Sequence, residues 1–223
     1  MDIYPKKVHH YPTFRIDSIG NSLTKLYHEF LRTRRSVRRF LSTPVPREVL
    51  DRIIETATWA PSAHNRQPWR FLVLSMPGAK ARLAELMGIH FRQDLLADGH
   101  PPAEVDAQVL RSHQRITEAP VVIVLCLDPA GMDHYPDENR RQAEHMMAIQ
   151  GVTLSGGTLL LAAHAEGLGG VWVCAPLFAP RAVRQALDLP EDWEPLGLLL
   201  LGYPAAAPRV RPRRPVDEVT RFY

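Results

Sequence analysis

The stretch VVIVLCLD, residues 121–128, is apolar at seven consecutive positions and directly follows Pro120. A continuous apolar run of this length is typical of a strand that is covered on both faces of its sheet. Three further runs have the same character: WRFLVLS at 69–75, GGVWVC at 169–174 and PLGLLLLGYP at 195–204. Because segments with helical patterns separate the four runs, the sequence predicts a mixed sheet covered by helices.

The segments between these runs have the spacing of amphipathic helices. From Val49 to Ala57 apolar side chains recur at i, i+1, i+4, i+5 and i+8; Pro46 suits the first turn of this helix, which stops before Pro61. The other predicted helices begin near Ser22 or span residues 77–98, 102–117, 137–166 and 180–187. We therefore expect an N-terminal arm at residues 1–21 and a single α+β domain at residues 22–223 that ends in a C-terminal extension.

Composition narrows the possible functions. The chain has 223 residues, 45% of them apolar, which fits one domain with a substantial core. The formal net charge of +3 is too small to indicate a dedicated nucleic-acid binder, so we expect no nucleic-acid partner. The ten histidines have no acidic or thiol companions at metal-ligand spacing, so no metal site is predicted.

The two cysteines, Cys126 and Cys174, both lie in apolar runs, and we expect both to be buried strand thiols. The absence of a disulfide framework predicts a reducing, cytoplasmic location. The N-terminal sequence lacks the apolar core of a signal peptide. Polar residues and glycines interrupt the apolar segment 146–163, so we expect a buried helix there and no membrane span.

The run RRSVRRF, residues 34–40, is the first feature that indicates a ligand. In an extended segment, alternation places Arg34, Ser36 and Arg38 on one side. Two guanidinium groups and a hydroxyl on one side would bind a phosphate monoester. A solvated basic turn between two helices fits the pattern equally well. A nucleic-acid patch fits less well, because the aromatic residues lie mainly in the predicted core strands.

Two further features can supply ligand contacts. The loop APSAHNRQPW, residues 60–69, is polar, stiffened by two prolines and longer than the usual link between a helix and a strand. The cluster RVRPRRP, residues 209–215, could bring more arginines to the same phosphate. An ordinary connection and a disordered basic tail are the respective alternatives. Common motifs of nucleotide-binding loops, zinc proteases and serine hydrolases do not occur in the sequence.

The three features, in this order and spacing, resemble those of the FMN-dependent nitroreductase family over about residues 30–220. The resemblance implies an α/β/α sandwich with a mixed, mainly antiparallel sheet, extended terminal arms and an intertwined homodimer. It implies FMN at the dimer interface. It also implies ping-pong hydride transfer from a reduced nicotinamide or deazaflavin to an organic acceptor. No catalytic side chain is expected, because the flavin carries the chemistry.

The resemblance also implies which residues contact FMN. Arg34 and Ser36 would bind the phosphate, and Arg38 would lie by the N1–O2 edge of the ring, where negative charge accumulates. The remaining implied contacts come from the same run, from the partner subunit's loop, from the backbone near flavin N5 and from the C-terminal cluster. They are Arg35 and Val37; Pro61, Ser62 and Asn65; Val173, Cys174 and Ala175; and Arg211 and Arg213.

Within the family, FRQDLLADG at 91–99 and HYPDENRRQAEH at 134–145 resemble the reductase domain of the bifunctional protein that completes coenzyme F420. This implies a dehydro-deazaflavin acceptor that contacts Asp94 and Gly131, with His64 as a further substrate contact. The alternatives are a general reductase of nitroaromatics and quinones, a flavin-destroying dimethylbenzimidazole synthase, and a module that only binds flavin or nucleic acid.

Overall fold

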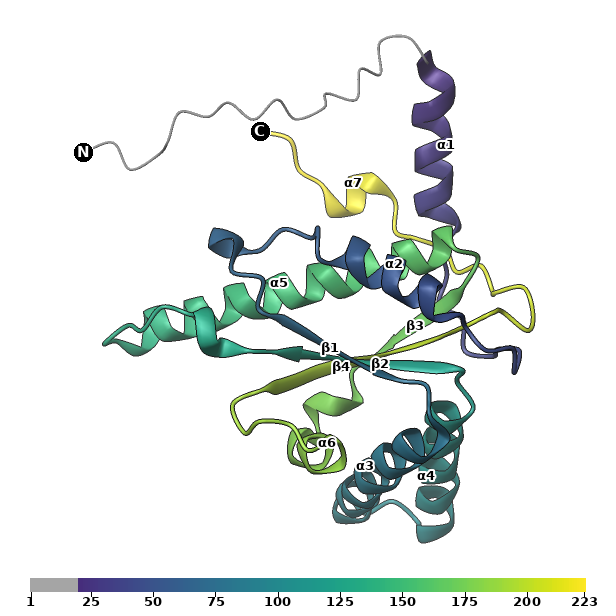
Figure 1. The fold of residues 1–223 in the computed structure, drawn as a ribbon, viewed down its shortest axis with the longest axis vertical. Coiled ribbons are helices and arrows are strands. Elements are labelled where there is room, and N and C mark those ends of the chain that lie inside the picture. Colours follow the sequence, from purple (N-terminus) through teal and green to yellow (C-terminus); the bar gives the residue numbers. More distant parts are fainter. Residues whose placement is uncertain (1–19) are drawn as a thin grey trace. The chain divides into compact units, whose positions relative to one another are not determined.

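The computed structural model describes residues 20–223 (Figure 1). The chain divides into two compact units, residues 1–34 and residues 35–223. In the first unit, helix α1 spans Gly20–Thr33, as the pattern beginning near Ser22 predicts. The predicted N-terminal arm lies outside the described residues, apart from the two that begin α1.

The second unit is built on one four-stranded sheet. Its strands are β1 (Trp69–Leu74), β2 (Val121–Leu127), β3 (Gly169–Val173) and β4 (Glu194–Gly202), in the order β1-β2-β4-β3. All three strand pairs are antiparallel. Among the described residues, parallel pairing is confined to one isolated bridge between Ser36 and Gly170. The predicted, mainly antiparallel α+β sandwich is therefore confirmed.

The central strand β2 explains why its sequence is apolar without interruption. Successive side chains of a strand point to opposite faces. Val121, Ile123 and Leu125 belong to one core, while Val122 and Val124 belong to the other. Because helices cover both faces of the sheet, neither set of positions is left to solvent (Figure 1).

Two helices cover one face of the sheet and three cover the other (Figure 1). The first face carries α2 (Arg47–Ala57) and α5 (Glu138–Ala165). The second face carries α3 (Pro77–Ala97), α4 (Pro102–Thr117) and α6 (Pro180–Leu187). Short helical segments complete the fold: η2 (Ala63–Asn65), η3 (Pro129–Gly131), η4 (Ala175–Leu177) and α7 (Val216–Val219).

Helix α5 is long and apolar enough, by composition alone, to cross a membrane. In the structure it packs against α2 and all four strands. A methyl group at Gly156 would lie 2.3 Å from the Trp172 ring, so this glycine lets α5 approach β3 closely. The apolar character of α5 thus reflects its place in the core, as the sequence predicts.

The prediction for Cys174 is wrong. Strand β3 ends at Val173, and Cys174 precedes η4 as an exposed residue. Cys126 is buried in β2 as expected, and burial raises the pKa of its thiol to about 12. Only Cys174 is therefore in a position to meet a ligand.

Candidate functional site

The arginine-rich run lies along the free edge of β3. The backbone N–H of Val37 donates to the carbonyl of Gly170 at 3.0 Å, and its side chain is buried. A methyl group at Gly169 would lie 2.7 Å from Val37, so Gly169 makes this close packing possible. Ser36 and Arg38, the neighbours of Val37 in the chain, are both exposed. Arg34 belongs to the first unit, so its place beside them stays a prediction.

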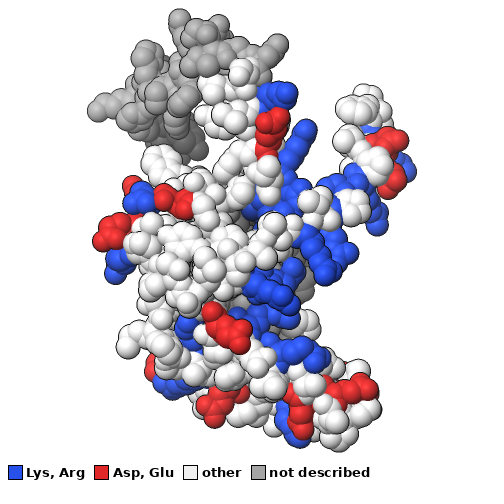
Figure 2. Space-filling view, turned by 90° about the vertical axis from the view of Figure 1, so that its right-hand side faces the viewer, with Lys and Arg blue, Asp and Glu red and all other residues white. Residues whose placement is uncertain are grey.

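The run is also tied to the start of the C-terminal extension. The N–H of Leu41 donates to the carbonyl of Tyr203 at 2.8 Å, and that of Ala205 donates to Arg39 at 3.1 Å. Arg38 therefore lies between two backbone anchors, on β3 and on the chain leaving β4. The extension continues to Arg211 and Arg213, both exposed. Lys and Arg side chains gather on the face shown in Figure 2, with acidic ones more scattered.

A cavity of about 530 Å³ opens between helices α3 and α4 and the end of β3. Three consecutive residues, Val173, Cys174 and Ala175, line it together with Asp94 of α3. The stretch Val173–Ala175 was predicted to approach the flavin, and Asp94 was predicted to contact the substrate. The two come from separate parts of the sequence. The structure therefore brings two of the predicted groups of site residues into one cavity.

Cys174 lines the cavity, and its backbone N–H and carbonyl differ in their hydrogen bonding. Among the described residues, none accepts a hydrogen bond from the N–H of Cys174. Its carbonyl, by contrast, accepts from Leu177 at 3.1 Å and closes the turn of η4. An N–H without a protein partner at the wall of a cavity is suited to a ligand acceptor atom.

The loop before β1 has an unusual backbone. His64, Asn65 and Gln67 have φ angles of 52°, 53° and 53°, in the left-handed region that non-glycine residues seldom adopt. The N–H of Gln67 donates to the Ser62 hydroxyl at 3.0 Å, which holds the turn closed. The loop then joins the sheet, because the carbonyl of Pro68 accepts from the N–H of Asp128 at 2.8 Å.

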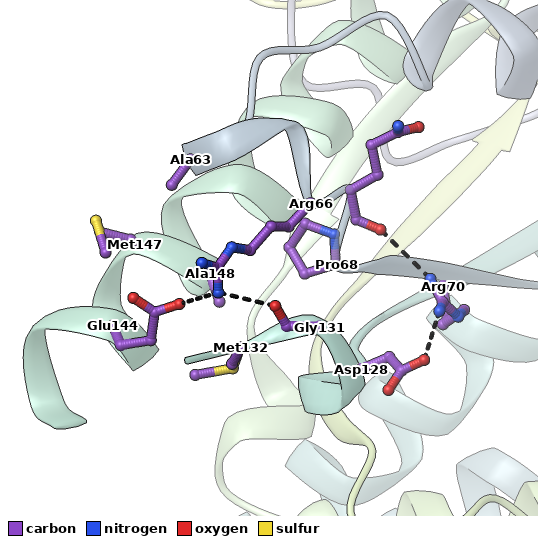
Figure 3. Close-up of a pocket in the computed structure, with 11 residues that line it drawn as sticks. Ala63, Arg66, Pro68, Arg70, Asp128, Gly131, Met132, Glu144, Met147 and Ala148 are labelled. Carbon is purple, nitrogen blue, oxygen red and sulfur yellow. Dashed lines mark hydrogen bonds and ion pairs between the residues drawn. The ribbon is translucent and has the colours of Figure 1, made fainter. Parts of the chain in front are cut away.

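Arg66 fastens this loop to the segment that follows β2 (Figure 3). Its guanidinium donates to the Gly131 carbonyl at 2.8 Å, to Glu144 at 2.7 Å and to Asp133 at 2.5 Å. Glu144 is only 3% exposed, and its second oxygen is buried with no hydrogen-bond partner among the described residues. The hydrogen bond from Arg66 lowers the pKa of Asp133. We call Arg66, Gly131, Asp133 and Glu144 the loop clamp.

The loop clamp changes the interpretation of Gly131. Its carbonyl is engaged by Arg66, and Gly131 does not line the cavity that holds Asp94. Arg66 and Glu144 were not among the predicted site residues. Neither residue stands out in the sequence, since one arginine in a polar loop and one glutamate in a charged helical turn resemble many others.

The loop and the cavity lie apart within one chain. The loop enters β1 at one edge of the sheet, whereas Val173 ends β3 at the other edge, three strand spacings or roughly 14 Å away. The loop also packs on the α5 side, and the cavity lies on the α3 side. A single chain therefore leaves the predicted contacts Pro61, Ser62, His64 and Asn65 away from the cavity.

Comparisons with known proteins agree with this architecture. Residues 31–203 match the nitroreductase family. A protein of Methanothermobacter thermautotrophicus named for NADH dehydrogenase or NAD(P)H nitroreductase activity is 29% identical over 82% of this chain and 80% of its own length. The 5,6-dimethylbenzimidazole synthase of Rhodospirillum rubrum is 31% identical over 85% and 84%. An FMN complex of a nitroreductase-like protein from Desulfovibrio desulfuricans superposes with a TM-score of 0.66 at 27% identity, covering 86% of this chain and 94% of that one.

Proposed function

Because the chain belongs to the nitroreductase family, we propose that it is an FMN-dependent oxidoreductase that passes a hydride from NAD(P)H to an organic acceptor. The observation that carries this proposal is the cavity at the end of β3. It combines an apolar wall, the free N–H of Cys174 and polar residues of α3 and α4. This is the combination expected of a site for flat, partly apolar ligands.

The residues present fit FMN. Ser36 and Arg38 are exposed in a segment whose backbone is held by hydrogen bonds, and a hydroxyl and a guanidinium both donate to oxygen anions. When bound, FMN would supply the chemistry by taking up a hydride in one half-reaction and releasing it in the next. Ser36, together with Arg34, would hold the phosphate. Arg38 would stabilise negative charge on the ring, and the N–H of Cys174 would orient it.

We also propose that the complete site forms between two copies of the chain. The loop at residues 61–68 has the polar side chains and the fixed conformation expected of a ligand-contacting segment. Yet it lies on the opposite edge of the sheet from the cavity of its own chain. A second copy that placed its loop over this cavity would complete each of two equivalent sites. Arg211 and Arg213 would then add positive charge near the phosphate.

Two finer assignments of the reaction have separate support. The resemblance of residues 91–99 to the F420-completing reductase domain implies a deazaflavin-type acceptor, the dehydro form of the F420 precursor, and Asp94 of that stretch lies in the cavity wall. The 31% identity to a dimethylbenzimidazole synthase favours oxidative destruction of the flavin instead. The two reactions can be distinguished by the flavin absorbance, which returns after turnover of a reductase and is lost after the synthase reaction, because the synthase consumes its flavin.

The test begins with the purified protein in the absence of oxygen. We expect visible flavin absorbance that NADH or NADPH bleaches, and recovery on addition of a nitroaromatic, a quinone or the dehydro-deazaflavin. Recovery with one acceptor at a far higher rate assigns the substrate. Loss of the flavin spectrum after reoxidation with air would establish the synthase reaction. A colourless protein that takes up no FMN would refute the proposal.

A further inference from the structure

Helix α4 turns a row of polar side chains toward the cavity. Gln108, Arg111, Ser112 and Arg115 all line it, at positions i, i+3, i+4 and i+7 of the helix. This spacing places the four side chains along one side of the helix. The row flanks the buried Val105 and Ile116: Ser112 lies one turn from Ile116, whereas Arg111 and Arg115 lie farther round the helix and are exposed. We call the four polar residues the α4 stripe.

Within residues 20–223, the two arginines of the α4 stripe have no protein counter-ion. In the described chain, neither Arg111 nor Arg115 lies within ion-pair distance of a carboxylate. Arg92 and Asp106, on the same two helices, do pair, at 3.0 Å. Helices α3 and α4 can therefore neutralise an arginine between them. Two like charges one turn apart on a helix repel each other, so a bound anion would relieve this repulsion.

The cavity has a basic end and an acidic end. Arg92 pairs with Asp106, and a methyl group at Gly88 would lie 3.4 Å from Val109. This antiparallel register places Arg111 and Arg115 beside the first half of α3. Asp94 and Asp98, which also line the cavity, lie near the turn between the helices instead. An anionic group would therefore be attracted to the α4 stripe and repelled from the turn.

The rest of the cavity wall is suited to the apolar part of the same ligand. Met87, Phe91 and Leu95 project from α3 at i, i+4 and i+8, and Val173 closes the wall at the end of β3. A planar ring could lie against these side chains while an anion on the same molecule reached α4. The volume of about 530 Å³ is within the range of pockets for small organic ligands.

We propose that the α4 stripe is a binding subsite for an anionic group, a carboxylate or a phosphate, that the hydride donor or the acceptor carries. Arg111 and Arg115 provide charge-assisted hydrogen bonds, and Ser112 and Gln108 add neutral donors. The ring that exchanges the hydride lies toward Val173–Ala175. This inference rests on the proposed oxidoreductase function, and it specifies the kind of substrate that the enzyme prefers.

The experiment compares FMN-loaded wild-type protein with a double variant, Arg111→Gln and Arg115→Gln. Glutamine keeps the helix propensity and removes both charges. Arg181→Gln is the matched control, because Arg181 is exposed on α6 and does not line the cavity. A second double variant, Arg111→Lys and Arg115→Lys, keeps the charges and should restore part of the effect.

Two pairs of substrates distinguish the source of the anion. The acceptor arm compares 4-nitrobenzoate with its neutral methyl ester, and the donor arm compares NADPH with reduced nicotinamide riboside, which lacks phosphate. We expect the Gln variant to lose about tenfold or more in kcat/KM for the anionic member of one pair, and less than twofold for the neutral member. Loss in the donor arm assigns a phosphate, and loss in the acceptor arm assigns a carboxylate.

Equal effects on the charged and neutral members of both pairs would overturn the inference, as would no effect on any of them. Calorimetric titration of 4-nitrobenzoate and NADP⁺ provides a readout that needs no turnover. If the protein bound no flavin, the proposed function would fail by itself. Binding of either anion that weakened about tenfold in the Gln variant, and not in the Arg181 control, would still support the subsite.

Discussion

Arginines in two regions of this molecule have opposite surroundings. In the loop clamp, Arg66 donates to one carbonyl and two carboxylates of its own chain. In the α4 stripe, Arg111 and Arg115 face a cavity, and the described chain provides no carboxylate to pair with them. The difference separates arginines that hold the fold from arginines available to a ligand. An arginine-rich sequence does not make this distinction, which depends on where acidic groups lie in space.

The two regions also differ in what their charges stabilise. The loop clamp holds a segment with three left-handed residues, a conformation that is unfavourable unless other contacts enforce it. Its geometry is thus fixed before any ligand arrives, which lowers the cost of ordering on binding. In the α4 stripe, the positive charges are fixed on a helix and stay accessible. We therefore expect loop-clamp substitutions to change stability and stripe substitutions to change substrate preference.

The largest effect should follow Glu144→Ala. Glu144 is buried, and one oxygen accepts hydrogen bonds both from Arg66 and from the N–H of Asp133. Removing it should lower the free energy of unfolding by about 3 kcal/mol, as for one partner of a buried ion pair. Urea denaturation measures this loss. Asp51→Ala, which breaks an exposed pair with Arg47, is the control and should change stability far less, because water screens an exposed ion pair.

A similar loss in both variants would mean that the loop clamp is an ordinary surface network. The loop clamp would then not be a region whose charges stabilise the fold. A large loss of unfolding free energy for Glu144→Ala alone would support this stabilising role.

Arg34→Ala should have the next largest effect, but on ligand binding. We propose that Arg34 contacts the FMN phosphate, so its loss should weaken FMN binding about tenfold to a hundredfold and leave the urea midpoint almost unchanged. Flavin fluorescence during titration of the apoprotein measures the affinity. Arg209→Ala, at an exposed position of the extension, is the control. Retention of stoichiometric FMN by the Arg34 variant would contradict the phosphate role.

Much of the fold could be predicted from the sequence, because prolines and glycines mark where elements begin and end. The predicted ranges 102–117 and 180–187 agree with α4 and α6 residue for residue, and the helix predicted between Pro46 and Pro61 corresponds to α2. Cys174 was placed wrongly because the apolar run continues one residue past the last strand pair, Val173 with Leu198. Apolar composition identifies a strand, whereas pairing decides where it ends.

The site was less predictable, because it depends on contacts between distant residues. Arg66 and Glu144 are 78 residues apart, and nothing local in either segment indicates that they meet. Arg111 and Arg115 look like solvent-facing positions of an amphipathic helix until β3 and α3 are seen to form a cavity beside them. Asp94 was expected to contact substrate through the family resemblance, and the structure places it in the same cavity.

Acid should weaken the loop clamp in a specific pH range. The hydrogen bond from Arg66 lowers the pKa of Asp133 in the folded protein, so folding favours the ionised carboxylate. This contribution is fully present above the unfolded pKa of about 4 and is lost as the pH falls through the lower folded value. The free energy of unfolding, measured from pH 6 downward, should therefore decline less steeply below about pH 4 in Asp133→Asn than in wild type. Parallel declines would show that Asp133 does not contribute.

Cys174→Ser should have the smallest effect, although Cys174 lines the cavity in which we place the reaction. Our proposal assigns the ligand contact to its backbone N–H, which serine keeps, and the change from sulfur to oxygen alters the wall only slightly. The rate of flavin reduction by NADPH should therefore stay within about twofold of wild type. Alkylation of the exposed thiol should, by contrast, slow the reaction, because the added group occupies the cavity. Near-complete loss of activity in the serine variant, with FMN still bound, would assign the chemistry to the thiol. The ligand-binding region would then depend on a reactive side chain as well as on fixed charge.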